Sequence, residues 1–155
     1  MKTLVIYDSY FSNTEQIAQA IASALKAQGE VVVKKIADTV LDDLQGVGLL
    51  LVGSPTRGFR PTPAILDFIK GLPDGRLKDV KTAGFDTRIG GEDIDSKFLR
   101  GMVKMGGYAA KPIDKALIKK GGTQVLPPEG FFVGDTEGPL KEGELQRAAE
   151  WVKGL

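Results

Sequence analysis

The sequence predicts an α/β protein: a three-layer sandwich in which helices cover both faces of an open parallel sheet. Short apolar runs alternate along the chain with amphipathic helical stretches, and such alternation builds parallel sheets through right-handed crossovers. The run at 49–52 is apolar on both faces, as in strands that helices cover on both sides. The length of 155 residues suits one domain, which we expect to span residues 1–155.

The first half of the chain is expected to hold three strands and two helices. The predicted strands cover residues 3–7, 31–36 and 49–52. The first helix ends at Gly29, a favourable C-terminal residue, and its buried stripe consists of Ile17, Ala18, Ile21, Ala24 and Leu25. The second helix begins at Thr62 and Pro63, which are typical of a helix N-terminus, and buries Ile65, Phe68, Ile69 and Leu72.

The second half is expected to complete the sheet. A fourth strand covers 81–86, helices are predicted around 98–103 and over 112–120, and Gly106 and Gly107 separate them. The fifth strand covers 123–126 and 131–133, with an interruption at Pro127 and Pro128 because proline cannot donate to a strand ladder. The closing helix buries Leu145, Ala148, Ala149 and Val152.

Composition excludes several kinds of chemistry. The chain has no cysteine and no histidine, which removes disulfides, thiolate nucleophiles and the commonest metal ligands, so we expect neither a metal site nor catalytic side chains. The apolar run from Leu4 to Tyr7 is too short to span a membrane, and we expect a cytoplasmic monomer. A net charge of +1 argues against nucleic-acid binding. Seven basic residues between Lys97 and Lys120, against the single acid Asp114, are interpreted as a solvated helix face.

Ligands of such sheets bind beyond the carboxyl ends of the strands, here in the loops after residues 7, 53 and 86. The first loop, residues 8–15, reads DSYFSNTE directly before a helix. Backbone amides at a helix N-terminus, together with nearby hydroxyls, predict a phosphate cradle. The loop has no lysine and neither glycine-rich nucleotide motif, which favours a monoester phosphate. Ser12 and Glu15 also fit a capping box, which needs no ligand, and taken by itself the loop favours the capping box.

This loop resembles the phosphate loop of the flavodoxin family, and Ser9, Ser12, Asn13 and Thr14 match its pattern. The resemblance implies a five-stranded parallel sheet of order 2-1-3-4-5 and FMN as the cofactor. Tyr10 stands where the family commonly has a small hydroxyl residue, and Ser12 where it has glycine. The phosphate-binding residues implied by the resemblance are Ser9, Tyr10, Phe11, Ser12, Asn13 and Thr14.

The second loop, Gly53 to Arg60, is similar to the flavodoxin loop beside the flavin ring. Gly58 matches a glycine whose peptide changes orientation when the flavin is protonated, and a glycine there allows close approach of the backbone. The residue before it, often a stacking aromatic in the family, is Arg57, so Arg57 or Phe59 has to cover the ring. The implied cofactor contacts in this loop are Pro55, Thr56, Arg57, Gly58 and Phe59.

The third loop, Asp86 to Gly91, resembles the flavodoxin segment that contacts the pyrimidine edge of the flavin with backbone amides. Its implied cofactor residues are Asp86, Thr87, Arg88, Gly90 and Gly91. The family's usual aromatic is missing here, and Tyr108 either replaces it or packs on the preceding helix.

Two other classes with this topology fit less well. Receiver domains need an aspartate at the end of the third strand, where this chain has Gly53 and Ser54. Low-molecular-weight phosphatases need a cysteine nucleophile, which this chain lacks.

Three functions remain: an FMN-binding electron carrier, an FMN-dependent NAD(P)H:quinone-type reductase, and a flavin-free interaction or sensor domain. The absence of a visible substrate domain favours the carrier, which would pass electrons between redox partner proteins. The pI of the sequence is 7.9, and Arg57, Arg60 and Arg88 are expected near the ring. Positive charge there stabilises the anionic reduced flavin, so we expect a less reducing flavin and an acidic partner.

Overall fold

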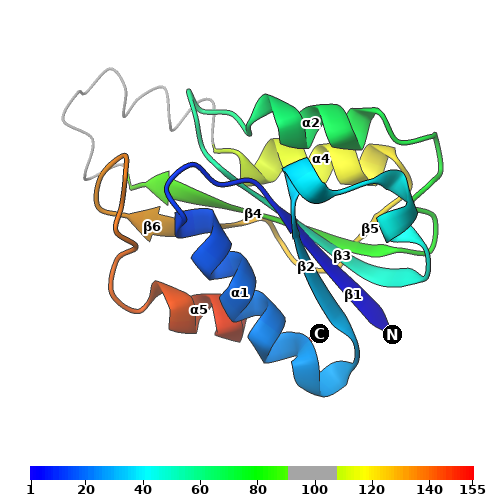
Figure 1. Cartoon of the computed structure of the whole chain (residues 1–155), viewed down its shortest axis with the longest axis horizontal. Coiled ribbons are helices and arrows are strands. Elements are labelled where there is room, and N and C mark those ends of the chain that lie inside the picture. Colours follow the sequence, from blue (N-terminus) through cyan, green and yellow to red (C-terminus); the bar gives the residue numbers. More distant parts are fainter. Residues whose placement is uncertain (91–107) are drawn as a thin grey trace.

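The computed structural model describes residues 1–90 and 108–155. Its strands are parallel in every pair and lie in the order β2-β1-β3-β4-β5, with β6 also paired to β4 (Figure 1). The strands are β1 (Lys2–Tyr7), β2 (Val31–Lys35), β3 (Val47–Pro55), β4 (Lys81–Ile89), β5 (Thr123–Gln124) and β6 (Glu129–Val133). The predicted order 2-1-3-4-5 is therefore confirmed, with the fifth strand in two pieces on either side of the two prolines.

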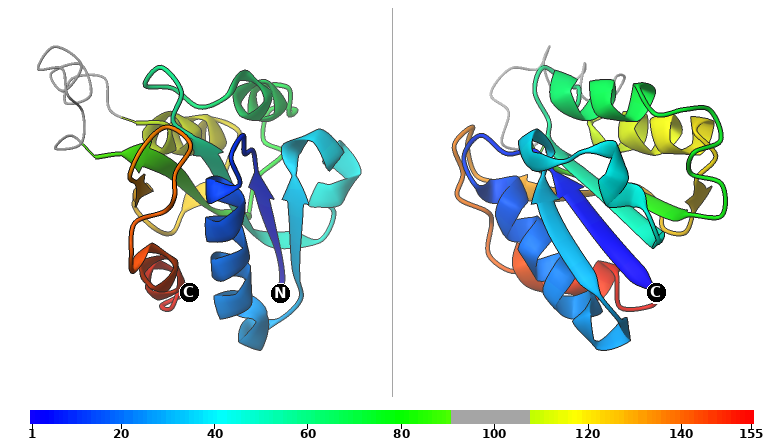
Figure 2. Two further views of the ribbon diagram at one scale, coloured as in Figure 1. Left: turned by 60° about the vertical axis from the view of Figure 1, so that its left-hand side comes forward. Right: turned by 45° about the vertical axis from the view of Figure 1, so that its right-hand side comes forward.

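Helices cover both faces of the sheet, which makes the three predicted layers. Figure 2 shows α1 and α5 on one side and α2 and α4 on the other. The α-helices are α1 (Asn13–Leu25), α2 (Pro63–Lys70), α4 (Ala110–Lys119) and α5 (Glu144–Trp151), and three short 3-10 helices are η1 (Lys26–Gln28), η2 (Ile36–Asp38) and η3 (Leu41–Leu44). None of the helices in the described ranges is long and apolar enough to cross a membrane.

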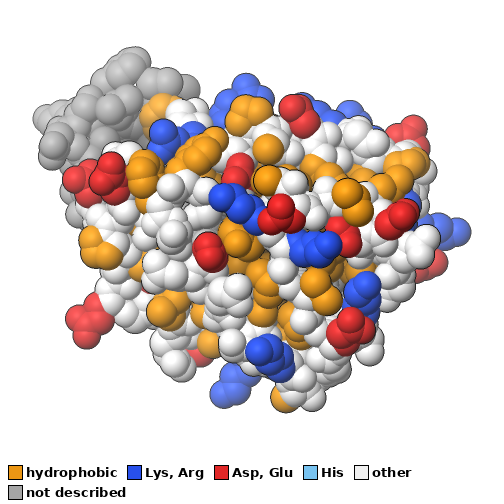
Figure 3. Space-filling model, viewed as in Figure 1, with side chains coloured by type: hydrophobic (Ala, Val, Ile, Leu, Met, Phe, Trp, Pro, Cys, Tyr) orange, Lys and Arg blue, Asp and Glu red, His pale blue; other side chains and the backbone are white. Residues whose placement is uncertain are grey.

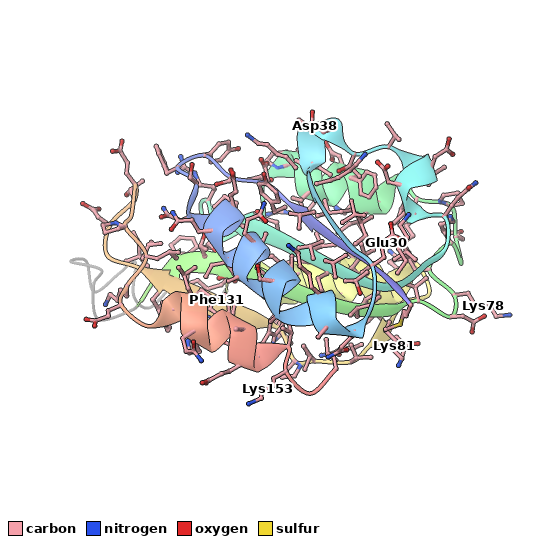
Figure 4. The ribbon with its side chains drawn as sticks, turned by 60° about the horizontal axis from the view of Figure 1, so that its bottom comes forward. Glu30, Asp38, Lys78, Lys81, Phe131 and Lys153 are labelled. Atoms are coloured by element: carbon pink, nitrogen blue, oxygen red, sulfur yellow. The ribbon has the colours of Figure 1, made fainter. Side chains whose placement is uncertain are left out.

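Each face of the sheet has its own apolar core. The predicted stripe of α1 packs in one core with α5, and that of α2 packs in the other with α4. Phe131 of β6 lies near α5 (Figure 4). Its ring meets the rings of Phe85 and Trp151 edge to face. Gly53 lies against the Phe85 ring so closely that a Cβ atom would overlap it. These contacts fix the carboxyl end of β3 beside that of β4.

The fourth strand is longer than the sequence predicted, and the expected end at Asp86 is wrong. Residues 86–89 continue the strand because β3 and β6 both run alongside and supply partners, with Asp86 opposite Ser54 and Gly130. The third strand likewise runs on to Pro55. The helix predicted around 98–103 and the break at Gly106 and Gly107 lie outside the described residues.

Candidate functional site

The first loop is tied to the start of α2 by Asp8. One carboxylate oxygen of Asp8 accepts the backbone N–H of Ser9 at 2.9 Å, and the other accepts the hydroxyl of Thr62 at 2.6 Å. The backbone N–H of Thr62 donates to Ser54 Oγ at 2.9 Å. All of these groups are buried, so the loop has a fixed position relative to the end of β3.

The same loop presents donors that have no acceptor. Ser9 Oγ is buried and has no hydrogen-bond partner among the described residues. Backbone N–H groups from Tyr10 to Glu15 likewise donate to no group in that part of the chain. A buried polar atom without a partner costs free energy, so natural proteins rarely keep one without a ligand or water to satisfy it. The loop is therefore suited to an anion with several oxygen acceptors.

The capping-box alternative is not realised. Ser12 adopts a left-handed conformation (φ 68°, ψ 2°), and its side chain makes no capping hydrogen bond. The hydroxyl therefore does not satisfy the N–H groups at the start of α1. Ser12 stands where the related loop commonly has glycine, and its positive φ gives the physical reason for that preference.

Replacing Ser12 by glycine is expected to keep or slightly raise the free energy of unfolding. The left-handed conformation costs a non-glycine residue about 1–2 kcal/mol. The greater freedom of glycine in the unfolded chain offsets roughly 0.5–1 kcal/mol of that gain. Urea denaturation of the two variants Ser12→Gly and Ser12→Val checks this, because valine in the same conformation should lower stability. Equal stability of both variants would contradict the conformation found here.

The second loop is a tight turn closed by two backbone hydrogen bonds. Arg57 N–H donates to the Arg60 carbonyl at 2.8 Å, and Arg60 N–H donates to the Arg57 carbonyl at 3.0 Å. The two central residues both have positive φ, 54° for Gly58 and 67° for Phe59. Positive φ at both positions is the signature of a type I′ turn, which explains the glycine.

Arg57 projects from this turn across the aromatic residues of the first loop. Its guanidinium carbon lies 5.0 Å from the centre of the Tyr10 ring and 5.9 Å from that of Phe11. Both residues are exposed, Tyr10 by 53% and Phe11 by 41%. Phe59 is half-buried and does not line the cavity described below. Of the two residues expected to cover a ring, the structure therefore brings Arg57 to the site, together with Tyr10.

The third loop differs most from expectation, because Asp86 lies under the site and is fully buried. Arg88 donates to both of its carboxylate oxygens at 2.7 and 2.6 Å, and the Ala110 N–H donates at 2.8 Å. Burial raises the pKa of Asp86, and the bonds from Arg88 oppose that rise. The guanidinium also lies 3.8 Å from the centre of the Tyr108 ring. The charge of Arg88, expected to act on a bound ring, is thus largely compensated by Asp86.

The three loops meet around one cavity of about 280 Å³. Its lining includes most of the residues expected from the sequence: Ser9, Tyr10, Phe11, Asn13, Thr14, Pro55, Thr56, Arg57, Gly58, Thr87 and Arg88. The hydroxyls of Thr14 and Thr87 are 2.8 Å apart, which joins the first and third loops directly. The predicted residues that do not line it are Ser12, Phe59, Asp86 and Gly90. Gly91 lies outside the described residues.

Three lining residues were not expected from the sequence: Ile89, Val133 and Thr136. Val133 ends β6, and Thr136 follows it in the segment that packs on the first loop. There, Asn13 Nδ2 donates to the Glu137 carbonyl at 3.2 Å. The rule that ligands bind beyond carboxyl ends of strands applies equally to the last strand and would have indicated this segment.

The family model for flavodoxins matches residues 5–151. The chain belongs to the flavodoxin family. Flavodoxins bind FMN and transfer electrons, so this protein is an electron-transfer flavoprotein with FMN as its cofactor.

Solved structures of other flavodoxins share the fold at low sequence identity. Flavodoxin 2 from Bacillus cereus superposes with a TM-score of 0.74 at 21% identity, covering 98% of this chain and 95% of that one. A short-chain flavodoxin associated with a bacterial microcompartment superposes with a TM-score of 0.76 at 18% identity, covering 100% of this chain and 96% of that one. The match to rubredoxin oxygen:oxidoreductase from Desulfovibrio gigas gives 0.72 at 20% identity and covers 98% of this chain but 34% of that larger one.

The cavity of this flavodoxin has the donor set that FMN requires. Ser9 Oγ and the amides of residues 10–15 are available as donors to a phosphate, and the described residues that line the cavity include no carboxylate. The aromatic residues of the first loop can provide stacking contacts for a ring. Within the described ranges, no cluster of three or more carboxylates is placed to hold a metal ion.

Proposed function

We propose that this flavodoxin carries electrons between redox partner proteins through FMN held by the three loops, with the phosphate in the loop from Ser9 to Thr14. The observation that carries the proposal is the buried Ser9 hydroxyl, which has no partner in the described part of the chain and lines the cavity. When bound, FMN accepts and releases electrons one or two at a time. The chain itself binds the phosphate, orients the ring and sets the local charge.

Binding of FMN against riboflavin tests this site directly, because riboflavin has the same ring and no phosphate. We expect FMN to bind at least tenfold more tightly to the flavin-free protein, since each hydrogen bond to a charged group contributes about 1.5–3 kcal/mol. Flavin fluorescence quenching and visible absorption measure both affinities. Equal affinities, or no binding of either flavin, would remove the phosphate site from the first loop.

The carrier function predicts slow reduction by NAD(P)H until a partner reductase is added. The three loops surround the cavity that the proposed flavin would occupy, and a carrier exchanges electrons with a partner protein instead of binding a second substrate there. Stopped-flow absorbance with the FMN-loaded protein, with and without an added NADPH-dependent flavoprotein reductase, measures this. Rapid steady turnover of NAD(P)H and a quinone by the protein alone would replace the carrier function by that of a reductase.

Arg57 is expected to raise the reduction potential of the bound flavin. It is the exposed cation at the mouth of the cavity, whereas Arg88 is paired with Asp86. Two exposed unit charges in contact interact by up to about 1 kcal/mol in water. Arg57→Gln should therefore lower the potential of the second electron by roughly 20–40 mV. Arg60→Gln, at the other end of the same turn, is the matched control, and redox titration that finds equal shifts in both variants would contradict this role.

A further inference from the structure

Basic side chains line the groove between α2 and α4, and no carboxylate is among its described lining residues. Arg60, Lys70, Lys115 and Lys119 line it around an apolar floor that includes Leu66 and Ala116. Its volume is about 420 Å³. By contrast, acidic and basic side chains are interspersed over the face of the molecule shown in Figure 3.

These four cations have no ion-pair partner in the described part of the chain. Other cations there do: Lys34 pairs with Asp43, Arg88 with Asp86, and Arg147 with Glu129 and Glu144. The fifth basic residue of the groove, Lys120, is held by the Leu72 carbonyl at 2.7 Å and Asp74 at 3.5 Å. Among the residues that the structure describes, these cations therefore have no compensating carboxylate, and an anionic partner can bind them.

The pattern on α4 itself costs helix stability. Lys111, Lys115 and Lys119 recur every four residues on one exposed stripe, and like charges at this spacing repel one another. Asp114 is the only acid of this helix, and it is buried on the opposite side against the sheet. A stripe of this kind is better suited to a partner than to solvation alone.

The groove adjoins the proposed flavin site through a single turn. Arg60 lines the groove, and Arg57, hydrogen-bonded to it across the turn, lines the cavity. A protein seated along α2 and α4 thus touches the loop that covers one side of the ring. Electrostatic complementarity of this kind speeds encounter and orients partners.

We propose that the α2/α4 groove is the docking surface for an acidic segment of the redox partner protein. This inference rests on the proposed carrier function and adds the partner's chemistry and its place on the surface. Carboxylates of the partner meet the lysines, and apolar side chains between them contact the floor. The docking segment of the partner is therefore expected to carry negative charge, opposite to the positive charge of the groove.

A fluorescein-labelled oligoglutamate peptide tests the groove on the full-length, FMN-loaded protein. The triple variant Lys70→Gln, Lys115→Gln, Lys119→Gln removes the proposed contacts and also relieves repulsion along α4. Its matched control is Lys26→Gln, Lys35→Gln, Lys153→Gln, three exposed lysines outside the groove. Lys153 projects from the α1 and α5 layer in Figure 4. Both variants change net charge equally.

Fluorescence anisotropy at low ionic strength is expected to show binding that the groove variant weakens about tenfold and the control less than twofold. Added salt should weaken binding to the parent protein. Carbodiimide cross-linking followed by mass spectrometry should join the peptide to Lys115 or Lys119. An equal loss of peptide affinity in both variants, or cross-links only to lysines outside the groove, would overturn the proposal.

A nucleic-acid partner and a loss of flavin each give a distinct result in this experiment. A single-stranded oligonucleotide of equal charge that binds the same lysines more tightly than the peptide would overturn the proposal in favour of nucleic acid. The visible spectrum of each sample reports the flavin independently. FMN bound in all variants, with no role for the groove lysines in peptide binding, would contradict the docking surface and leave the proposed function standing.

Discussion

Asp114→Asn is expected to stabilise the protein by about 2–3 kcal/mol above pH 7 and to change little at pH 4. Asp114 lies on the buried side of α4, with 4% of its surface exposed, and its Oδ1 has no hydrogen-bond partner in the described part of the chain. Burial raises the pKa of Asp114 from 3.8 to about 6, and a backbone hydrogen bond with Gly84 opposes that rise. A rise of this size corresponds to roughly 3 kcal/mol.

The sign follows from proton binding. Between pH 4 and pH 6 the folded protein keeps the proton on Asp114 while the unfolded chain has lost it, so stability falls as pH rises through this window. Above the pKa that Asp114 has in the folded protein, this loss of folding stability is complete and no longer changes with pH. Asparagine stays neutral and removes this contribution.

Urea denaturation across pH 4 to 8 measures the effect. The difference in stability between the parent and Asp114→Asn should grow as pH rises from 4 through the folded pKa of about 6 and then stay constant. The matched control is Asp67→Asn on α2, an exposed acid for which no comparable change is expected. A constant difference across the range would contradict the assignment to Asp114.

Ser9→Ala is expected to weaken FMN binding about 10- to 100-fold while the flavin-free protein becomes equally or more stable. The hydroxyl is buried without a partner among the described residues, so the flavin-free fold bears its desolvation cost, whereas bound phosphate supplies a charged acceptor. A hydrogen bond to a charged group contributes about 1.5–3 kcal/mol. Removing the hydroxyl therefore acts in opposite directions on binding and on stability.

Fluorescence titration with FMN and urea denaturation without it measure the two effects. Ser12→Ala removes a hydroxyl from the same loop that does not line the cavity, and it should change FMN affinity less than threefold. A merely structural role of Ser9 predicts the opposite result for stability, namely a loss in the flavin-free protein. A parallel loss of FMN binding and of stability in Ser9→Ala would therefore contradict a phosphate contact.

The sequence did not reveal that Asp86 is buried, because a buried carboxylate looks like a loop residue when its partners are unknown. Arg88 and the N–H of Ala110 supply those partners, and the second of them comes from a distant helix. The spacing of Asp86 and Arg88 gave part of this information, because residues two apart on a strand face the same side of the sheet. Recognising the strand up to Ile89 would have paired Asp86 with Arg88 and removed Arg88 from the charges acting on the flavin.

Residue order alone was enough to predict the layer architecture, the strand order through the family resemblance, and the donor-rich first loop. These three features depend on local periodicity, turn residues and one short motif, and each of these patterns can be recognised within a short stretch of sequence. The folded chain was needed to show that Ser9 is buried with no partner in the described ranges, that Ser12 does not cap α1, and that Val133 and Thr136 join the site. It was also needed to show which charges remain uncompensated, because ion pairing and burial depend on residues brought together from distant parts of the chain.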